Sequence, residues 1–162
     1  MANESTPADP AAEQKPLVLV VDDEYGPRES IAFTLSGEFT VETADRAADA
    51  IARIRERPFA AVVMDIRMPE MDGVRALEEL RKHDSEVSVI MLTGYGTLLT
   101  AQQTMAAGAN QYLRKPPDVN ELIEAVRKQT AATRLRRRQA SISREAMDLN
   151  GALKREIENV TK

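Results

Sequence analysis

The sequence predicts a doubly wound α/β domain built on one five-stranded parallel sheet. Short apolar runs alternate five times with segments of helical periodicity, which is the pattern of a parallel sheet covered by helices. Three of these runs are apolar at nearly every position, as is typical of strands buried on both faces. The chain has 162 residues, of which 43% are apolar, so it is long enough for one sizeable core.

Five strands are expected, each followed by a helix. In chain order they cover residues 17–21, 39–43, 60–64, 87–92 and 110–114. The first, third and fourth are the apolar runs and belong in the middle of the sheet. The second alternates and the fifth is mixed, and these patterns suit its edges. With right-handed crossovers, these assignments favour the strand order 2-1-3-4-5.

The five helices are expected from apolar positions at helical spacing. Pro27 can occupy the first helical position of the first helix, and Asp118 and Glu121 have the spacing of a capping box at the start of the last one. The expected inward positions, helix by helix, are Ile31 and Leu35; Ala47, Ile51 and Ile54; Val74, Leu77 and Leu80; Leu98, Ala101 and Met105; and Leu122, Ile123 and Val126.

Missing residue types exclude several chemistries. The chain has no cysteine and a single histidine, His83, which excludes disulfides, thiolate nucleophiles and zinc knuckles. No apolar run reaches the roughly 20 residues that span a bilayer, so no membrane partner is expected. Residues 1–15 are acidic and rich in Pro, Ala, Ser and Thr, which favours a disordered leader over a signal peptide and predicts a cytoplasmic protein.

Polar side chains follow the strands where ligands bind in open parallel sheets, beyond the carboxyl ends. Asp22 and Asp23 follow the first strand, Asp65 the third, Thr93 the fourth and Lys115 the fifth. Two carboxylates about 4 Å apart repel by about 4 kcal/mol at an effective dielectric constant of about 20. A cluster of three therefore needs a cation or protons, and oxygen ligands without His or Cys favour Mg²⁺.

Taken one at a time, these polar residues have simpler structural roles that need no functional site. Asp22 and Asp23 can cap the turn into the first helix, and Asp65 can begin a solvated loop. The convergence of all five groups at one edge favours a site. Nucleotide binding is disfavoured, because there is no phosphate-binding loop motif and Gly94-Tyr95-Gly96 lacks a third glycine at Leu99.

Residues 16–130 resemble the receiver domain of two-component response regulators, chemotaxis regulators included. The resemblance rests on the Asp22–Asp23 pair, Asp65 with its Met-Pro-x-Met-Asp-Gly loop, Thr93 and Lys115–Pro116. It implies that Asp65 accepts a phosphoryl group from a sensor histidine kinase or a small phosphodonor. It also implies no enzymatic turnover beyond self-phosphorylation and autodephosphorylation.

The resemblance further implies roles for neighbouring groups. The Mg²⁺ ligands would be Asp22, Asp23, Asp65 and the backbone carbonyl of Arg67, with Asp22 acting largely through water. Lys115 and Thr93 would hold the phosphoryl oxygens. Tyr112 matches the switch aromatic, although it can also simply cover the sheet edge. Pro117 stands where the family often has Phe, and we expect the bulky Tyr95 to slow autodephosphorylation.

Residues 131–162 form a helical extension with a candidate coiled-coil seam. From Arg127 onward the net charge is +6, against −10 for the rest of the chain. Leu135, Ile142 and Leu149 recur every seven residues, with Gln139, Ala146, Leu153 and Val160 between and beyond them. Glu156 and Gly151 weaken this pattern. A homodimer through this helix, or docking to another protein, is expected because isolated helices are marginal.

Two questions stay open at this stage. The basic run 134–138 can be a solvated helix face, can contact an acidic surface of the receiver, or can bind nucleic acid, which the lack of aromatic residues makes unlikely. The chain can be an interaction module that switches a protein-protein or dimerisation surface. Alternatively, it is the receiver fragment of a larger regulator whose DNA-binding or enzymatic output domain is missing.

Overall fold

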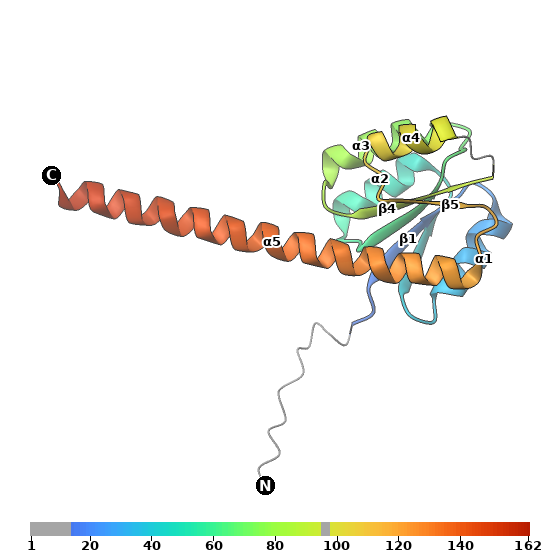
Figure 1. The fold of residues 1–162 in the computed structure, drawn as a ribbon, viewed down its shortest axis with the longest axis horizontal. Coiled ribbons are helices and arrows are strands. Elements are labelled where there is room, and N and C mark those ends of the chain that lie inside the picture. The colour runs from blue at the N-terminus through green and yellow to red at the C-terminus, as the bar shows by residue number, and fades with distance from the viewer. Residues whose placement is uncertain (1–13, 95–97) are drawn as a thin grey trace, which may run out of the picture.

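The computed structural model describes residues 14–94 and 98–162, and it confirms the predicted fold class. Its parallel sheet has the order β2-β1-β3-β4-β5 (Figure 1). The strands are β1 (Leu17–Val21), β2 (Thr40–Ala44), β3 (Ala61–Asp65), β4 (Ser88–Thr93) and β5 (Gln111–Arg114). The helices are α1 (Tyr25–Leu35), α2 (Ala47–Glu56), α3 (Gly73–His83), α4 (Leu98–Ala106) and α5 (Val119–Val160).

The hydrophobic core has two halves, one on each face of the sheet. Helices α2 and α3 cover one face together with α4, and α1 and α5 cover the other (Figure 1). Every residue of β3 and β4 is buried, whereas β2 and β5 each have a single buried residue. The apolar runs therefore lie in the centre and the mixed runs at the edges, as predicted, because only central strands are covered on both faces.

Two local predictions were wrong. Helix α1 begins at Tyr25, which makes Pro27 its third residue rather than its first. A proline is tolerated there because the first four N–H groups of a helix have no partner within it. Met105 is 47% exposed, and Thr104 takes the inward position of α4 instead. The Thr104 hydroxyl is satisfied by the carbonyl oxygens of Thr100 and Ala101, at 3.1 and 2.9 Å.

Helix α5 is much longer than the domain and projects from it (Figure 1). Asp118 caps its start, accepting a hydrogen bond from the backbone N–H of Glu121 at 3.4 Å. The helix is uninterrupted at residue 130, where the sequence suggests that the receiver ends, and Thr133 is still fully buried. Across residues 14–94 and 98–162, no helix combines the length and apolarity that a membrane span requires. Most of the expected leader, residues 1–13, lies outside the described residues.

Candidate functional site

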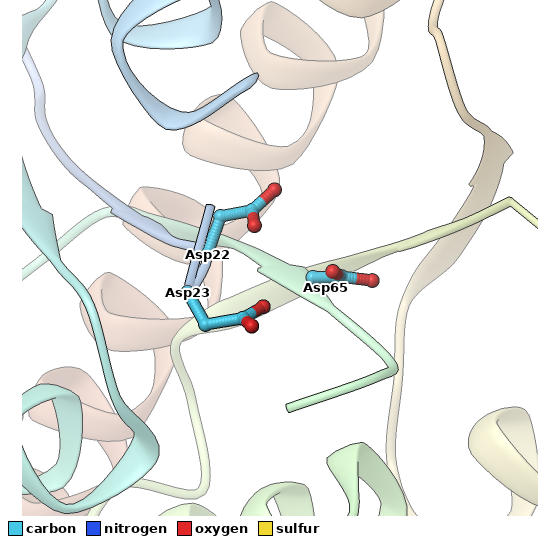
Figure 2. A group of neighbouring side chains, drawn as sticks. All are labelled: Asp22, Asp23 and Asp65. Carbon is cyan, nitrogen blue, oxygen red and sulfur yellow. The ribbon is translucent and has the colours of Figure 1, made fainter. Parts of the chain in front are cut away.

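Three carboxylates meet at the carboxyl edge of the sheet. Asp65 is the last residue of β3, and Asp22 and Asp23 follow β1 directly. The neighbouring strands β1 and β3 end side by side, so one oxygen of each carboxylate lies within 4.8 Å of the others (Figure 2). Asp22 and Asp65 are buried, whereas Asp23 is exposed. The sequence-predicted acidic residues are thus together, with Asp23 on the solvent side.

Lys115 supplies a positive charge to this acid cluster. It follows β5, and its backbone N–H donates to the carbonyl of Thr93 at 2.7 Å, which fixes it beside the end of β4. Its Nζ lies 2.6 Å from Oδ2 of Asp22 and 3.2 Å from Oδ2 of Asp65. The Lys115–Pro116 peptide bond is cis. One ammonium group therefore bridges the two buried carboxylates.

Backbone donors orient the same carboxylates. Oδ1 of Asp22 accepts a hydrogen bond from the N–H of Glu24 at 2.9 Å. Oδ1 of Asp65 accepts one from the N–H of Arg67 at 3.2 Å. Both contacts span two residues, the local geometry that aspartate favours at turns. Each acid is consequently held by its own loop before any ligand binds.

Burial and neighbouring charges act in opposite directions on the pKa of Asp65 and on that of Lys115. Burial raises the pKa of Asp65, and the hydrogen bonds from Arg67 and Lys115 only partly offset this effect. Burial alone would lower the pKa of Lys115, but the carboxylates of Asp22 and Asp65 outweigh it and raise this pKa. Lys115 therefore stays charged and favours the charged form of Asp65.

Two further predicted residues lie on the neighbouring strands β4 and β5. Thr93 is buried at the end of β4, next to Gly94. Tyr112 of β5 is partly buried, and its hydroxyl is buried without a hydrogen-bond partner among the described residues. An unpaired buried hydroxyl is costly, which marks this position as one that can gain from rearrangement. Tyr95, to which we assigned an effect on autodephosphorylation, lies outside the described residues.

The acid cluster opens into a cleft of about 740 Å³. Asp23, Asp65, Arg67 and Lys115 line it, as do Asp72 of the Met-Pro-x-Met-Asp-Gly loop and Glu24, to which the sequence analysis gave no role. The Asp72 side chain accepts from the N–H of Val74 at 3.1 Å and so caps α3. Glu24 directly follows the predicted acid pair, and this adjacency was the only signal for it.

The donor set of the acid cluster fits a hard divalent cation. Three carboxylates offer oxygen ligands within 4.8 Å of one another, and two of them, Asp23 and Asp65, line the cleft. Mg²⁺ prefers such oxygen ligands and usually keeps several waters, for which the open cleft leaves room. The site can therefore hold a metal with Asp23 and Asp65 as its accessible ligands.

The fold and the site together define a parallel α/β domain with an acidic, lysine-bridged pocket at its carboxyl edge. Residues 18–127 match the family model described as the response regulator receiver domain. This match covers more than half of the chain. The protein therefore belongs to the response regulator receiver domain family.

Comparisons with individual proteins agree with this assignment. The regulatory protein AtoC of Escherichia coli K12 is 41% identical over 107 residues, which are 65% of this chain and 23% of AtoC. A CheY-like receiver domain protein of Methanospirillum hungatei superimposes with a TM-score of 0.71 at 30% identity, covering 75% of this chain and 98% of that one. The beryllofluoride-activated NtrC4 receiver domain dimer gives a TM-score of 0.69 at 30% identity, covering 72% and 98%. The chain spans less than a third of the length of the curated relatives it matches.

Proposed function

We propose that this receiver accepts a phosphoryl group on Asp65 in a Mg²⁺-dependent reaction and thereby switches an interaction surface. The donor would be a phosphorylated histidine of a sensor kinase or a small phosphodonor. The observation that carries the proposal is the buried Asp65 carboxylate, which faces an open cleft and shares it with Asp23 and Lys115. A cytoplasmic location belongs to the same proposal.

The residues of the pocket supply what phosphoryl transfer requires. An oxygen of Asp65 attacks phosphorus in line with the leaving group, so an O–P bond forms while the N–P bond to the donor histidine breaks. Lys115, 3.2 Å from Asp65, is placed to stabilise the negative charge on the phosphoryl oxygens. Mg²⁺ held by Asp23 and Asp65 would add positive charge at the same oxygens. No further catalytic residue is needed, so we expect only self-phosphorylation and autodephosphorylation.

Thr93 and Tyr112 are the residues that we expect to respond to phosphorylation. Thr93 ends β4 immediately before Gly94, which lines the pocket, and Tyr112 lies on the adjacent strand β5, three residues before Lys115. A phosphoryl group gives the Thr93 hydroxyl and Lys115 a strong acceptor, worth about 1.5–3 kcal/mol per charge-assisted hydrogen bond. Moving an equilibrium from 1:99 to 99:1 takes about 5.5 kcal/mol, which a few such bonds supply.

A phosphorylation assay tests the proposal. Incubation with acetyl phosphate and Mg²⁺ should add one phosphoryl mass to the intact protein, and EDTA should prevent it. Asp65→Asn should abolish the product. Glu78→Gln, which changes an exposed acid of α3 away from the pocket, should leave it unchanged. Full phosphorylation of the Asp65→Asn variant would show that another residue is the acceptor.

The C-terminal part of α5 supports a proposed dimer. Leu135, Ile142, Leu149 and Leu153 are each more than half exposed and recur along one side of the helix. A second copy could cover this stripe by coiled-coil pairing. The structural neighbour NtrC4 is described as a dimer of activated receiver domains.

Light scattering distinguishes this arrangement from a monomer. We expect the mass of a dimer for the parent protein and a lower mass for Leu149→Glu, whereas Met147→Glu, which lies outside the heptad stripe, should keep the parent mass. Adding beryllofluoride and Mg²⁺ should change the mass or shape of the parent but not of Asp65→Asn. If neither the mass nor the shape of the parent protein responds, the phosphorylation state does not control assembly.

A second proposal is that the chain is the receiver part of a larger regulator. It is favoured by the lengths of the curated relatives, of which this chain spans less than a third. An output domain would then follow α5 and receive the signal through it. The length of the native reading frame decides between the two proposals.

A further inference from the structure

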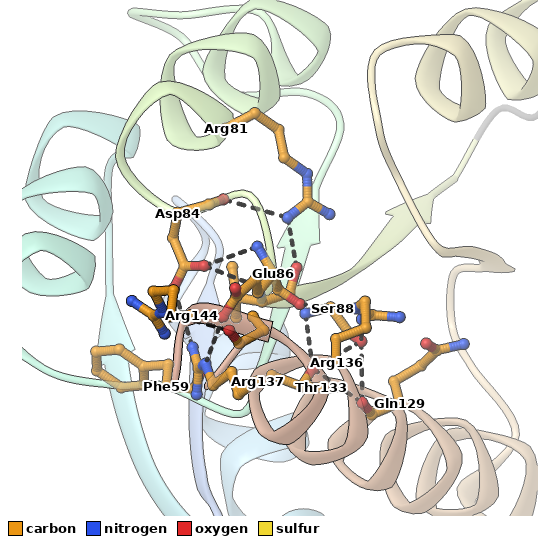
Figure 3. A network of polar contacts seen from close by, with 12 residues as sticks. Phe59, Arg81, Asp84, Glu86, Ser88, Gln129, Thr133, Arg136, Arg137 and Arg144 are labelled. Atoms are coloured by element: carbon orange, nitrogen blue, oxygen red, sulfur yellow. Dashed lines mark hydrogen bonds and ion pairs between the residues drawn. The ribbon is translucent and has the colours of Figure 1, made fainter. Parts of the chain in front are cut away.

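The basic run 134–138 has a structural role that its sequence alone leaves undecided. Arg136 and Arg137 are only partly exposed and contact the body of the domain, whereas Arg138 is exposed. We call Arg136 and Arg137 the arginine clamp (Figure 3). Their contacts lie at the start of β4 and at the end of the loop before β3, opposite the acid cluster. Of the readings of the basic run, contact with acidic side chains of the receiver thus holds for Arg137, whereas Arg136 bonds to a backbone carbonyl and a hydroxyl.

The arginine clamp contacts two separate segments of the body, the loop before β3 at Phe59 and residues 84–88. Nε of Arg136 donates to the carbonyl of Glu86 at 3.0 Å, and its Nη2 donates to Oγ of Ser88 at 2.5 Å. Nη2 of Arg137 donates to the carbonyl of Phe59 at 2.7 Å and to Oδ2 of Asp84 at 2.9 Å. The Asp84 and Arg137 side chains are only 17% and 27% exposed, so their ion pair is less screened than a surface pair.

Asp84 is positioned for this contact by its own surroundings. Its Oδ1 accepts hydrogen bonds from the N–H groups of Glu86 and Val87, both at 2.9 Å. Its carbonyl accepts from Nη1 of the partly buried Arg81 at 3.3 Å. The carboxylate therefore presents Oδ2 to Arg137 in a fixed orientation, so little side-chain entropy is lost when the pair forms.

A buried polar contact lies one turn earlier on α5. Oγ1 of Thr133 accepts a hydrogen bond from the N–H of Ser88 at 2.9 Å, and Oγ of Ser88 donates to the carbonyl of Gln129 at 2.9 Å (Figure 3). The N–H of Ser88 is thereby satisfied by α5 rather than by a neighbouring strand. From Gln129 to Arg137, α5 is attached to the start of β4 by directional hydrogen bonds as well as by apolar packing.

We propose that the arginine clamp fixes the direction in which α5 leaves the domain, so that residues 138–160 act as a rigid lever on the receiver body. The attachment at Gln129 and Thr133 holds one side of α5, and the clamp adds a second, lateral attachment one turn further on. A swing of about 10° at Thr133 moves residue 148, about 22 Å further along the helix, by about 4 Å. Loss of the clamp is therefore measurable at the far part of the helix.

Distances between spin labels on the body and on the lever test this proposal. The chain has no cysteine, so Arg55→Cys on α2 and Asp148→Cys on α5, both exposed, give one defined pair. Double electron–electron resonance, with excess unlabelled protein to suppress distances between molecules, should give a narrow distribution in this background. Arg136→Gln/Arg137→Gln should broaden the distribution by several ångströms. Arg138→Gln, which removes the adjacent exposed charge, should not.

A second variant tests the same contact in case the double variant does not fold. Asp84→Asn keeps an Oδ1 acceptor for the two backbone N–H groups and removes the charge opposite Arg137, so it should broaden the distribution in the same direction. Circular dichroism melting verifies that each variant is folded. A parent-like distribution in folded Asp84→Asn or in the folded double variant would overturn the proposal, as would equal broadening in Arg138→Gln. Neither readout requires Asp65 to be phosphorylated.

Discussion

At the scale of single residues, Asp65 is held in surroundings that oppose its charge. Burial raises its pKa, so the charged carboxylate is less favourable in the folded than in the unfolded protein. The penalty is absent below the ordinary aspartate pKa of about 3.9, grows as the pH rises toward the raised value, and is complete above it. Each unit of pKa shift corresponds to about 1.4 kcal/mol.

Replacing Asp65 by Asn should therefore stabilise the protein in the absence of divalent cations. Asn keeps the acceptor for the N–H of Arg67 and removes the charge. Urea unfolding in EDTA should show a higher free energy of unfolding for Asp65→Asn than for the parent at pH 7. The difference should shrink as the pH falls through the raised pKa of Asp65. A difference that grows on acidification would contradict the burial effect.

Removing the charge of Lys115 should instead destabilise the protein. Lys115→Met leaves the buried carboxylates of Asp22 and Asp65 without their shared ammonium group. Breaking a buried pair costs about 3–5 kcal/mol, and we expect the lower end because the lysine side chain keeps some exposure.

The pH dependence of Lys115→Met gives a second check. The stabilising effect of Lys115 is complete below its ordinary pKa and is lost as the pH rises through its raised value. At the acid end, protonation of Asp65 should reduce the loss. Urea unfolding of parent and variant from pH 5 to pH 8 measures this, and a loss independent of pH would argue against electrostatic coupling to Asp65.

The residues of the site were predictable to different extents. Asp22, Asp65 and Lys115 could be located because each ends or directly follows a strand, and parallel strands end at one edge. The unpaired hydroxyl of Tyr112 could not, because it depends on which side chains of other elements surround the ring. Arg137 pairs with Asp84, 53 residues away, and no local periodicity encodes such a contact.

At the scale of elements, the start of α3 depends on a close backbone approach. A Cβ on Gly73 would lie 2.6 Å from the carbonyl oxygen of Ile66, which is far inside contact distance. The N–H of Gly73 donates to this same oxygen at 2.9 Å and closes the loop that follows Asp65. The glycine thus allows the loop that carries Arg67 to fold back on β3.

Gly73→Ala should destabilise the protein by about 1–3 kcal/mol, because backbone has to move to relieve the clash. Gly26→Ala is the matched control: nothing lies within 4 Å of its added Cβ, and it lies in α1, where alanine is the better helix former. Thermal melting should place the control at or above the parent and Gly73→Ala below it. Equal melting temperatures would show that the loop adapts freely.

Element boundaries followed from the sequence more closely than helix faces did. Continuous apolar runs located β1, β3 and β4 to within a residue, because burial on both faces leaves little choice of residue type. The sequence predicted the position of helix α4 in the chain, but it did not predict which side of this helix faces the core. Thr104 can be buried because its hydroxyl bonds within its own helix, so polarity alone misplaced the apolar stripe at Met105.

At the scale of the whole molecule, the acidic body and the basic tail are not independent. The two arginines of the clamp belong to the basic tail and contact the body of the domain, where Arg137 lies near both Asp84 and Glu86. The charge boundary of the sequence near Arg127 therefore falls within the docked part of α5 rather than at its end. The cooperative unit should extend to about Arg137.

Hydrogen exchange should locate this limit. We expect backbone amides up to about Arg137 to be protected at every protein concentration, because tertiary contacts hold that part of α5. Amides of residues 141–158 should exchange quickly in dilute solution and gain protection as concentration rises, if a second copy covers the stripe. Protection of this segment that does not vary with dilution would argue against self-association as its cause.

The length of α5 has a consequence for access to the proposed phosphorylation pocket. From Arg137 to Val160 the helix advances about 35 Å at 1.5 Å per residue, on the order of the width of a small domain. It starts this advance from the edge of the sheet opposite Asp65. If Asp65 is the phosphoryl acceptor, a molecule bound at the C-terminal end of α5 would lie clear of the pocket. A phosphodonor and such a partner would then not compete for the same space.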